Sequence, residues 1–109
     1  MMEKSDWAIA VETLPEDMPV RGNAVASGND EEDREIEDGI INDLETGDEW
    51  AWCTVAVTVR FRDYLEHTEY LGGCSYASRQ DFVDNSGYYE DMVETCKEAI
   101  RTALARLTD

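Results

Sequence analysis

Alternating apolar and polar residues predict three β-strands in this chain. The first spans residues 7–13, the second residues 49–62 and the third residues 67–77. The second strand has the clearest pattern, and its apolar face is expected to point into the core. That face consists of Ala51, Cys53, Val55, Val57, Val59 and Phe61. A turn at residues 63–66 would join the second and third strands in an antiparallel hairpin.

The charged residues of this hairpin predict its register. A four-residue loop places Arg60 opposite Glu69 on the polar face and Tyr70 on the core face. A shift by one residue would instead turn the Glu69 carboxylate into the core, so the first register is preferred. Gly72 and Gly73 lie within the third strand, which predicts a β-bulge or the close approach of another part of the chain.

Apolar residues at helical spacing predict two helices. The first, residues 30–45, follows Asn29 or Asp30 as the N-cap and ends before Gly47. Its apolar stripe consists of Ile36, Ile40, Ile41 and Leu44. The second helix spans residues 89–107, and Ser78 is expected to cap one helical turn before it.

The element order β-α-β-β-α predicts an α+β fold. We expect a small antiparallel sheet of about three strands with two helices packed on one face. A length of 109 residues is typical of one domain, and residues 1–5 are expected to form a loose N-terminus.

The distribution of charge along the chain suggests a function for the first predicted helix. The chain has 26 acidic and nine basic residues, and residues 30–49 hold eleven of the acids but only one base, Arg34. A helix rises about 1.5 Å per residue, so the nine acids of residues 30–45 would be spread over roughly 24 Å, about one per 2.7 Å. Duplex DNA carries about one charge per 1.7 Å of its axis. This charge density indicates an interaction surface that imitates phosphates, although a solvated acidic face is an open alternative.

We therefore predict that the acids of this segment and the two tryptophans that follow bind a partner. The predicted residues are Asp30, Glu31, Glu32, Asp33, Glu35, Glu37, Asp38, Asp43, Glu45, Asp48, Glu49, Trp50 and Trp52. The tryptophans fall on the polar face of the second strand. Either the N-terminal segment packs on them or they are displayed as anchors for the partner.

The sequence contains no pattern of catalytic or metal-binding residues. The single histidine falls beside the predicted turn, and the carboxylates are too numerous to single out an acid–base pair. The three cysteines are expected to point inward as reduced thiols, and no paired ligands have zinc spacing. A calcium loop starting at Asp33 fails, because Asp38 stands where glycine is needed. We expect a non-enzymatic protein without cofactor or metal.

The net charge of −17 argues against direct nucleic-acid binding and favours a basic partner. No run of 18 apolar residues or signal segment appears, so we expect a cytoplasmic protein without membrane association. Two alternatives remain open. The protein could be an assembly module that forms a homodimer through the tryptophan-bearing sheet face, or a halophilic domain whose acids are spread over its surface.

Four sequence strings resemble those of small phage-associated reading frames. They are PVRGNA, GDEWAWC, YLGGCSY and GYYEDM. Separately, the size, acidity and α+β class are similar to those of phage inhibitors of bacterial defence, the anti-CRISPR and anti-restriction proteins, several of which imitate DNA. This resemblance implies an inhibitor in the host bacterial cytoplasm that occupies the nucleic-acid groove of a defence complex, most plausibly a CRISPR effector, and blocks target DNA binding.

The bunched acids and the complete apolar pattern predict folding at ordinary ionic strength. Far-UV circular dichroism should give the same folded spectrum at low and at molar salt. A chain that is unfolded at low salt and folds only in molar salt would favour the halophilic alternative.

Overall fold

The computed structural model describes residues 6–63 and 65–108, so the expected loose N-terminus lies outside the described residues. The elements in chain order are β1 (Trp7–Leu14), α1 (Asp30–Glu45), the short 3-10 helix η2 (Glu49–Ala51), β2 (Cys53–Phe61), β3 (Leu65–Cys74), α2 (Arg79–Asn85) and α3 (Tyr89–Thr108). They confirm a small α+β fold with a three-stranded antiparallel sheet. None of the helices within the described residues is long and apolar enough to cross a membrane.

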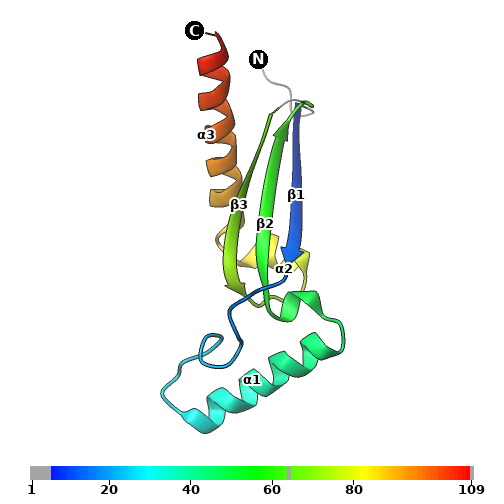
Figure 1. Ribbon diagram of the computed structural model, residues 1–109, viewed down its shortest axis with the longest axis vertical. Helices are drawn as coiled ribbons and strands as arrows, with labels where there is room; N and C mark the ends of the chain where they lie inside the picture. The colour runs from blue at the N-terminus through cyan, green and yellow to red at the C-terminus, as the bar shows by residue number, and fades with distance from the viewer. Residues whose placement is uncertain (1–5, 64, 109) are drawn as a thin grey trace.

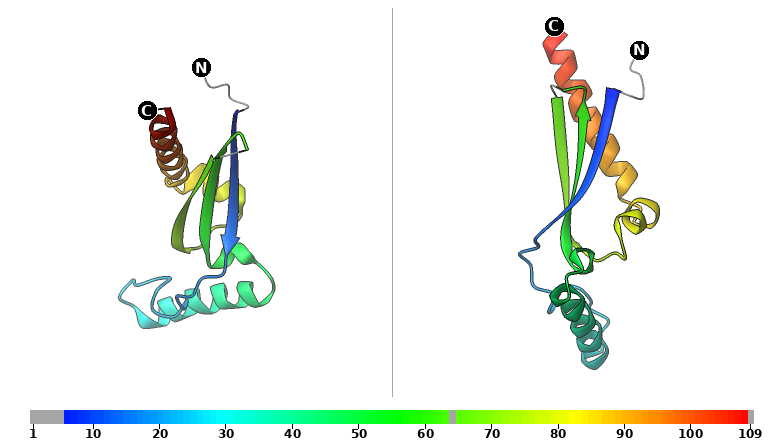
Figure 2. Two further views of the ribbon diagram at one scale, coloured as in Figure 1. Left: turned by 45° about the horizontal axis from the view of Figure 1, so that its top comes forward. Right: turned by 90° about the vertical axis from the view of Figure 1, so that its right-hand side faces the viewer.

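The sheet has the order β1-β2-β3, with β2 in the centre. Helices α2 and α3 lie on one face of the sheet (Figures 1 and 2). No helix or strand of the described residues covers the opposite face in these views. The molecule is elongated, with extents of 58 × 24 × 22 Å, because α1 extends it beyond one end of the sheet (Figure 1).

The core lies between β2 and the helices. Val55, Val57 and Val59 of β2 are completely buried, as the alternating pattern predicts. Phe82 of α2 and Cys96 of α3 face them and are completely buried as well. The expected apolar face of β2 is therefore the core face.

The expected hairpin register is wrong. The structure pairs Arg60 with Glu66 rather than Glu69, and Phe61 with Leu65. Three residues separate the strands instead of four, and the first of them, Arg62, has a φ of 53°. A left-handed residue turns the chain sharply after β2, but a non-glycine residue in this conformation is uncommon and gives little sequence signal.

In the observed register, the side chains of β3 before the bulge lie on the sheet faces opposite to those expected. Tyr70, expected inside, lies on the uncovered face with 64% of its surface exposed. Glu69 pairs with Val57 on the covered face, where its Oε1 lies 2.8 Å from Nε2 of His67. Because β3 is an edge strand, both side chains stay half-exposed, so the carboxylate is tolerated. His67 thus lies within β3, not beside a turn.

The glycine pair does form a bulge, as expected. Gly72 and Gly73 stand between Leu71 and Cys74, opposite Thr54 alone, which restores Cys74 to the core. A Cβ on Gly72 would lie 3.0 Å from Glu16, and one on Gly73 would lie 3.0 Å from Met18. The ends of the Glu16 and Met18 side chains would have to shift to admit side chains here, and Gly73 also has a φ of 64°, which favours glycine.

The expected packing of both helices on one sheet face holds for α3 but not for α1. Helix α1 lies across the end of the sheet (Figure 1). Ile36 is 49% exposed, and Ile40, Ile41 and Leu44 are only half-buried. The physical reason is that Glu37 falls between Ile41 and Leu44 on the apolar stripe, so packing this stripe on the core would bury a carboxylate there.

Phe82 is expected to be the most costly side chain to remove, because it is completely buried against both strands and helices. Phe82→Ala should lower the free energy of unfolding by about 3–5 kcal/mol, measured by urea denaturation. Tyr88→Ala, at a site 52% exposed, should change it by less than about 0.5 kcal/mol. Equal losses in the two variants would contradict this account of the core.

Candidate interaction surface on the acidic helix

Helix α1 starts and ends where local chemistry requires. Oδ1 of Asn29 accepts hydrogen bonds from the backbone N–H groups of Glu31 and Glu32, at 3.1 and 3.2 Å. Acids fill the first turn, where the helix dipole favours negative charge. The helix ends at the cap residue Thr46, and Gly47 follows with a φ of 100°. The 16-residue helix predicted from the sequence is confirmed.

One carboxylate attaches α1 to the rest of the protein. Glu37 is the only buried residue of the helix. Its Oε2 accepts a 2.7 Å hydrogen bond from the backbone N–H of Gly22, and its Oε1 lies 3.3 Å from the guanidinium of Arg21. The charge is therefore buried with partners, which removes most of the cost of its desolvation. Glu37 is a structural residue and not part of the exposed surface that the sequence suggested.

Four other predicted site residues also have partners within the protein. Asp38 pairs with Arg21, and Asp33 accepts hydrogen bonds from the backbone and hydroxyl of Ser27. These bonds hold the segment between β1 and α1 along the helix. Asp48 caps η2 through Trp50 N–H at 3.1 Å, and Glu49 accepts from the hydroxyl of Thr13 at 3.2 Å.

The segment before α1 is fixed to the sheet at a second place. The Glu16 carboxylate accepts hydrogen bonds from Gly73 N–H and, at 2.9 Å, from the Thr54 hydroxyl. The indole N–H of Trp52 donates to the Met18 carbonyl at 2.7 Å. Glu16 could not be found from the sequence, because its partners lie 38 and 57 residues away.

The two tryptophans are packed rather than displayed. Trp52 is 7% exposed, and its hydrogen bond to Met18 shows that the N-terminal segment covers it. Trp50 is half-buried and lies against Phe82, with 6.1 Å between ring centroids. Of the two alternatives for these residues, the structure shows packing, so neither is an exposed anchor for a partner.

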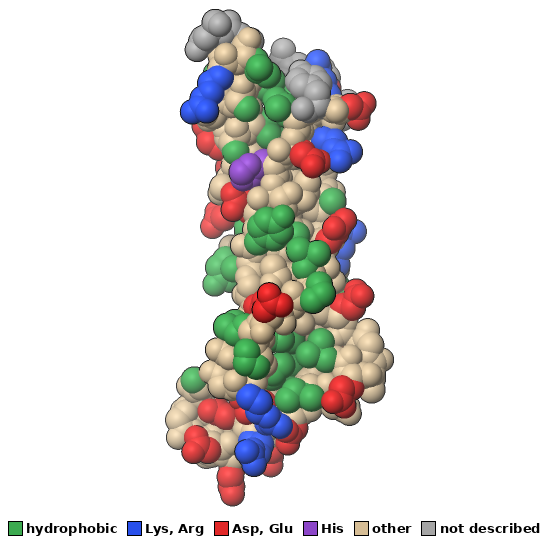
Figure 3. Space-filling view, in the orientation of Figure 1, with side chains coloured by type: hydrophobic (Ala, Val, Ile, Leu, Met, Phe, Trp, Pro, Cys, Tyr) green, Lys and Arg blue, Asp and Glu red, His purple; other side chains and the backbone are tan. Residues whose placement is uncertain are grey.

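Six predicted residues remain exposed, and their carboxylates have no hydrogen bond or ion pair among the described residues. They are Asp30, Glu31, Glu32, Glu35, Asp43 and Glu45. At 3.6 residues per turn, Glu31, Glu35 and Glu45 share a sector of about 80° on the outward side of the helix. Figure 3 shows acidic side chains around this end of the molecule, and further acids along the rest of it.

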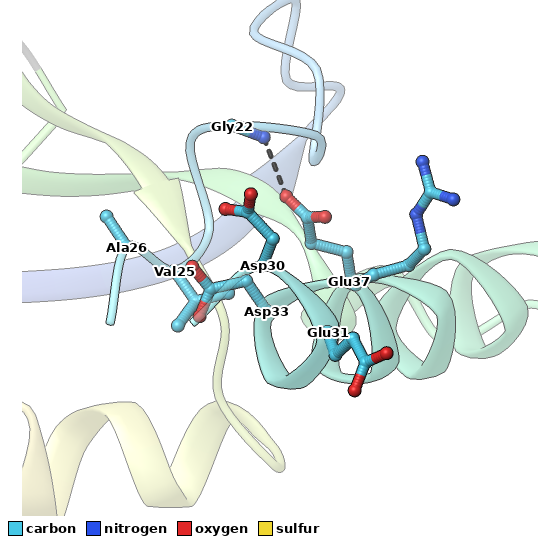
Figure 4. A pocket seen from close by; sticks show the side chains of 8 residues that line it. Gly22, Val25, Ala26, Asp30, Glu31, Asp33 and Glu37 are labelled. Atoms are coloured by element: carbon cyan, nitrogen blue, oxygen red, sulfur yellow. Dashed lines mark hydrogen bonds between the residues drawn. The ribbon is translucent and has the colours of Figure 1, made fainter. Parts of the chain in front are cut away.

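A cavity of about 510 Å³ separates α1 from the segment that precedes it. Figure 4 shows Asp30 and Glu37 directed toward the loop that carries Gly22, whereas Glu31 points away from it. The wall toward the loop is mainly apolar, with Val25 and Ala26. The acids on the two sides of α1 therefore differ in role: one side holds the loop and the other faces solvent.

The described residues contain no group of three side chains that could hold a metal ion. Cys53, Cys74 and Cys96 are buried free thiols, as expected. Burial raises the pKa of Cys53 to about 12 and also raises those of Cys74 and Cys96. These thiols are therefore protonated and unreactive near neutral pH.

Comparison with known proteins adds no relative: no protein-family model, curated protein or solved structure matches this chain.

The attachment of α1 through Glu37 can be measured at one amide. In Glu37→Ala, the Gly22 N–H loses its acceptor, so its hydrogen exchange should be roughly 10- to 100-fold faster, as expected for a lost hydrogen bond of about 1.4–2.7 kcal/mol. Glu35→Ala removes an exposed carboxylate two residues earlier and should leave this exchange rate unchanged. Equal rates in the two variants would show that Glu37 does not hold the loop.

Proposed function

We propose that the protein is a non-enzymatic inhibitor that binds a basic nucleic-acid-binding groove through the outward side of α1. The supporting observation is the arrangement of exposed carboxylates on one capped helix at the end of the molecule. The helix is bound to the protein by Glu37 on its inner side, so the outward acids need not move to meet a partner. A preorganised surface costs less conformational entropy on binding.

The spacing of the free acids fits one strand of nucleic acid. Six free carboxylates along a helix of roughly 24 Å give about one charge per 4 Å. Phosphates follow one another every 3.4 Å along the axis of a single DNA strand, and the two strands together give about one charge per 1.7 Å. Five of the predicted acids bind within the protein, and only Glu31, Glu35 and Glu45 of the six free ones share the outward side of the helix. The surface therefore imitates the charge density of one strand rather than that of a duplex.

The kind of partner follows from the resemblance to phage inhibitors of bacterial defence. In this proposal, α1 occupies the positively charged channel of a defence complex, a CRISPR effector foremost, and excludes target DNA from it. Such channels hold nucleic acid through its backbone rather than its sequence. A row of carboxylates can therefore compete without reproducing any base contact.

A second candidate function is assembly through the sheet. Helices α2 and α3 cover one face, and the other face carries the exposed ring of Tyr70. This alternative predicts self-association without any effect on DNA binding by a defence complex.

Neutralising the free acids should abolish inhibition while the fold is kept. The variant combines Glu31→Gln, Glu32→Gln, Glu35→Gln, Asp43→Asn and Glu45→Gln, and it leaves every internally bonded carboxylate in place. Because close charge pairs across interfaces couple by about 1.5–7 kcal/mol, we expect at least tenfold weaker displacement of labelled target DNA from a guide-loaded effector. Raising salt should weaken the wild-type protein in the same assay.

The matched control has the same change in net charge at other exposed positions whose carboxylates are not bonded within the described residues. It combines Glu12→Gln, Asp17→Asn, Asp63→Asn, Glu90→Gln and Asp91→Asn, and it should displace DNA within about twofold of wild type if only local charge matters. If the α1 variant displaces DNA as well as wild type does, or if both variants lose activity equally, α1 is not the binding surface. A panel of purified effector complexes in which wild type displaces DNA from none would contradict the proposed partner class.

A further inference from the structure

Strand β1 forms an edge of the sheet that no other described segment covers. It pairs with β2 along its whole length of eight residues, and Figures 1 and 2 show its other side at the border of the molecule. A strand edge of this kind offers a row of backbone N–H and C=O groups to another strand.

The register identifies which groups point outward. The backbone N–H of Arg62 donates to the Asp6 carbonyl at 2.8 Å, which makes these two residues a hydrogen-bonded pair. Bonding pairs alternate in antiparallel sheets, so Ala8, Ala10, Glu12 and Leu14 also bond to β2. The backbone groups of Trp7, Ile9, Val11 and Thr13 therefore point away from the sheet, and none has a backbone partner among the described residues.

The two edges of the sheet differ in how well they are protected against pairing with a further strand. The β3 edge carries Glu66 and Glu69 and is interrupted by the bulge at Gly72 and Gly73. Charges and bulges are the common means of preventing strand addition. Strand β1 has no charged residue from Trp7 to Val11 and no bulge in its pairing with β2. Only the β1 edge is open to a further strand.

We propose that β1 pairs with β1 of a second copy of this chain, antiparallel about a two-fold axis at Ala10. With Ala10 facing its own copy, Trp7 pairs with Thr13 and Ile9 with Val11, and each pair occurs twice by symmetry. The outward-pointing backbone N–H and C=O groups of all four residues then have hydrogen-bond partners in the second copy. A shift by two residues in one direction pairs Trp7 with Pro15, which has no N–H. A shift in the other direction leaves Thr13 without a partner among Trp7–Leu14.

Charges on both faces of the sheet fit this register. On the uncovered face, Glu12 of the second copy lies next to Ala8, whose neighbour on the other side is Arg60. Arg60 already pairs with Glu66 at 2.9 Å, so Glu12 would be its second carboxylate. The small Ala8 side chain leaves room for the two long ones to meet above it. On the covered face, Lys97 stands 5.4 Å above the Trp7 ring. Trp7 faces Thr13 of the second copy, which within its own chain is bonded to Glu49.

The same arrangement separates the acidic helices. Each β1 ends four residues from the axis, in opposite directions, so the ends of the two strands are roughly 26 Å apart. Helix α1 lies beyond that end in each copy. Since the Debye length is about 8 Å at physiological ionic strength, the two acidic surfaces are screened from one another, and both remain exposed.

A pair of cysteine variants tests the register directly. In the dimer, the two Ala10 residues form a non-hydrogen-bonded pair with about 4.5 Å between Cα atoms, within the range that a disulfide spans. Ala10→Cys should therefore cross-link under mild oxidant. Ala8→Cys is the matched control, because its two copies would be about 14 Å apart and should not cross-link. The native cysteines are buried and should not contribute.

The mass in solution provides the second measurement. Sedimentation at about 100 µM protein and 150 mM salt should give twice the chain mass for wild type, and Ile9→Val should behave alike. Ile9→Pro removes an outward N–H without breaking a bond to β2, so it should halve the mass. A monomeric wild type in which Ala10→Cys cross-links no faster than Ala8→Cys would overturn the proposal. Faster cross-linking of Ala8→Cys than of Ala10→Cys would overturn it as well. The two cross-linking rates test the proposed register even if Ile9→Pro fails to fold.

Discussion

The structure depends on the central position of β2. This strand is hydrogen-bonded on both sides, and its three completely buried valines meet α2 and α3. Its core face therefore provides three of the completely buried side chains of the domain. The helices cover that face only. On the opposite face the segment after β1 covers Trp52 and bonds to Thr54, whereas Tyr70 and the β1 edge stay exposed.

The acidic helix is attached to this core by polar contacts more than by apolar burial. Its apolar stripe is only half-buried, whereas Glu37 is buried and bonded to Gly22 and Arg21. Glu16 connects the same segment to β2 and β3. A hydrophobic attachment would have required α1 to turn more of its surface inward and to bury charge with it. The polar attachment uses a few carboxylates and leaves the others in solvent.

The sequence located most elements because their signals are local. Alternation gave β1 and β2, and the caps Asn29 and Ser78 marked the starts of α1 and α2. The hairpin register was not predicted, because it depends on the positive φ of Arg62. An arginine in the sequence does not indicate this backbone conformation, whereas a glycine would. The position of α1 escaped as well, since an amphipathic stripe shows which side of a helix is apolar but not what that side will meet.

The candidate surface was predictable only as a set of acids. Their concentration in residues 30–49 is visible in the sequence, but the division into bonded and free carboxylates is not. That division depends on the segment before α1 folding back along it, which brings Arg21 to Glu37 and Asp38. The burial of Trp52 under Met18 depends on the same segment.

The attachment of α1 by a single buried side chain has an evolutionary consequence. Substitutions on the outward side of this helix touch neither the core nor the bonds of Glu37, so selection for folding leaves these positions almost unconstrained. Selection by a changing partner can then act on them one at a time. Substitutions on this side of α1 can therefore adapt the protein to a partner whose binding groove changes, without lowering the stability of the fold at each step.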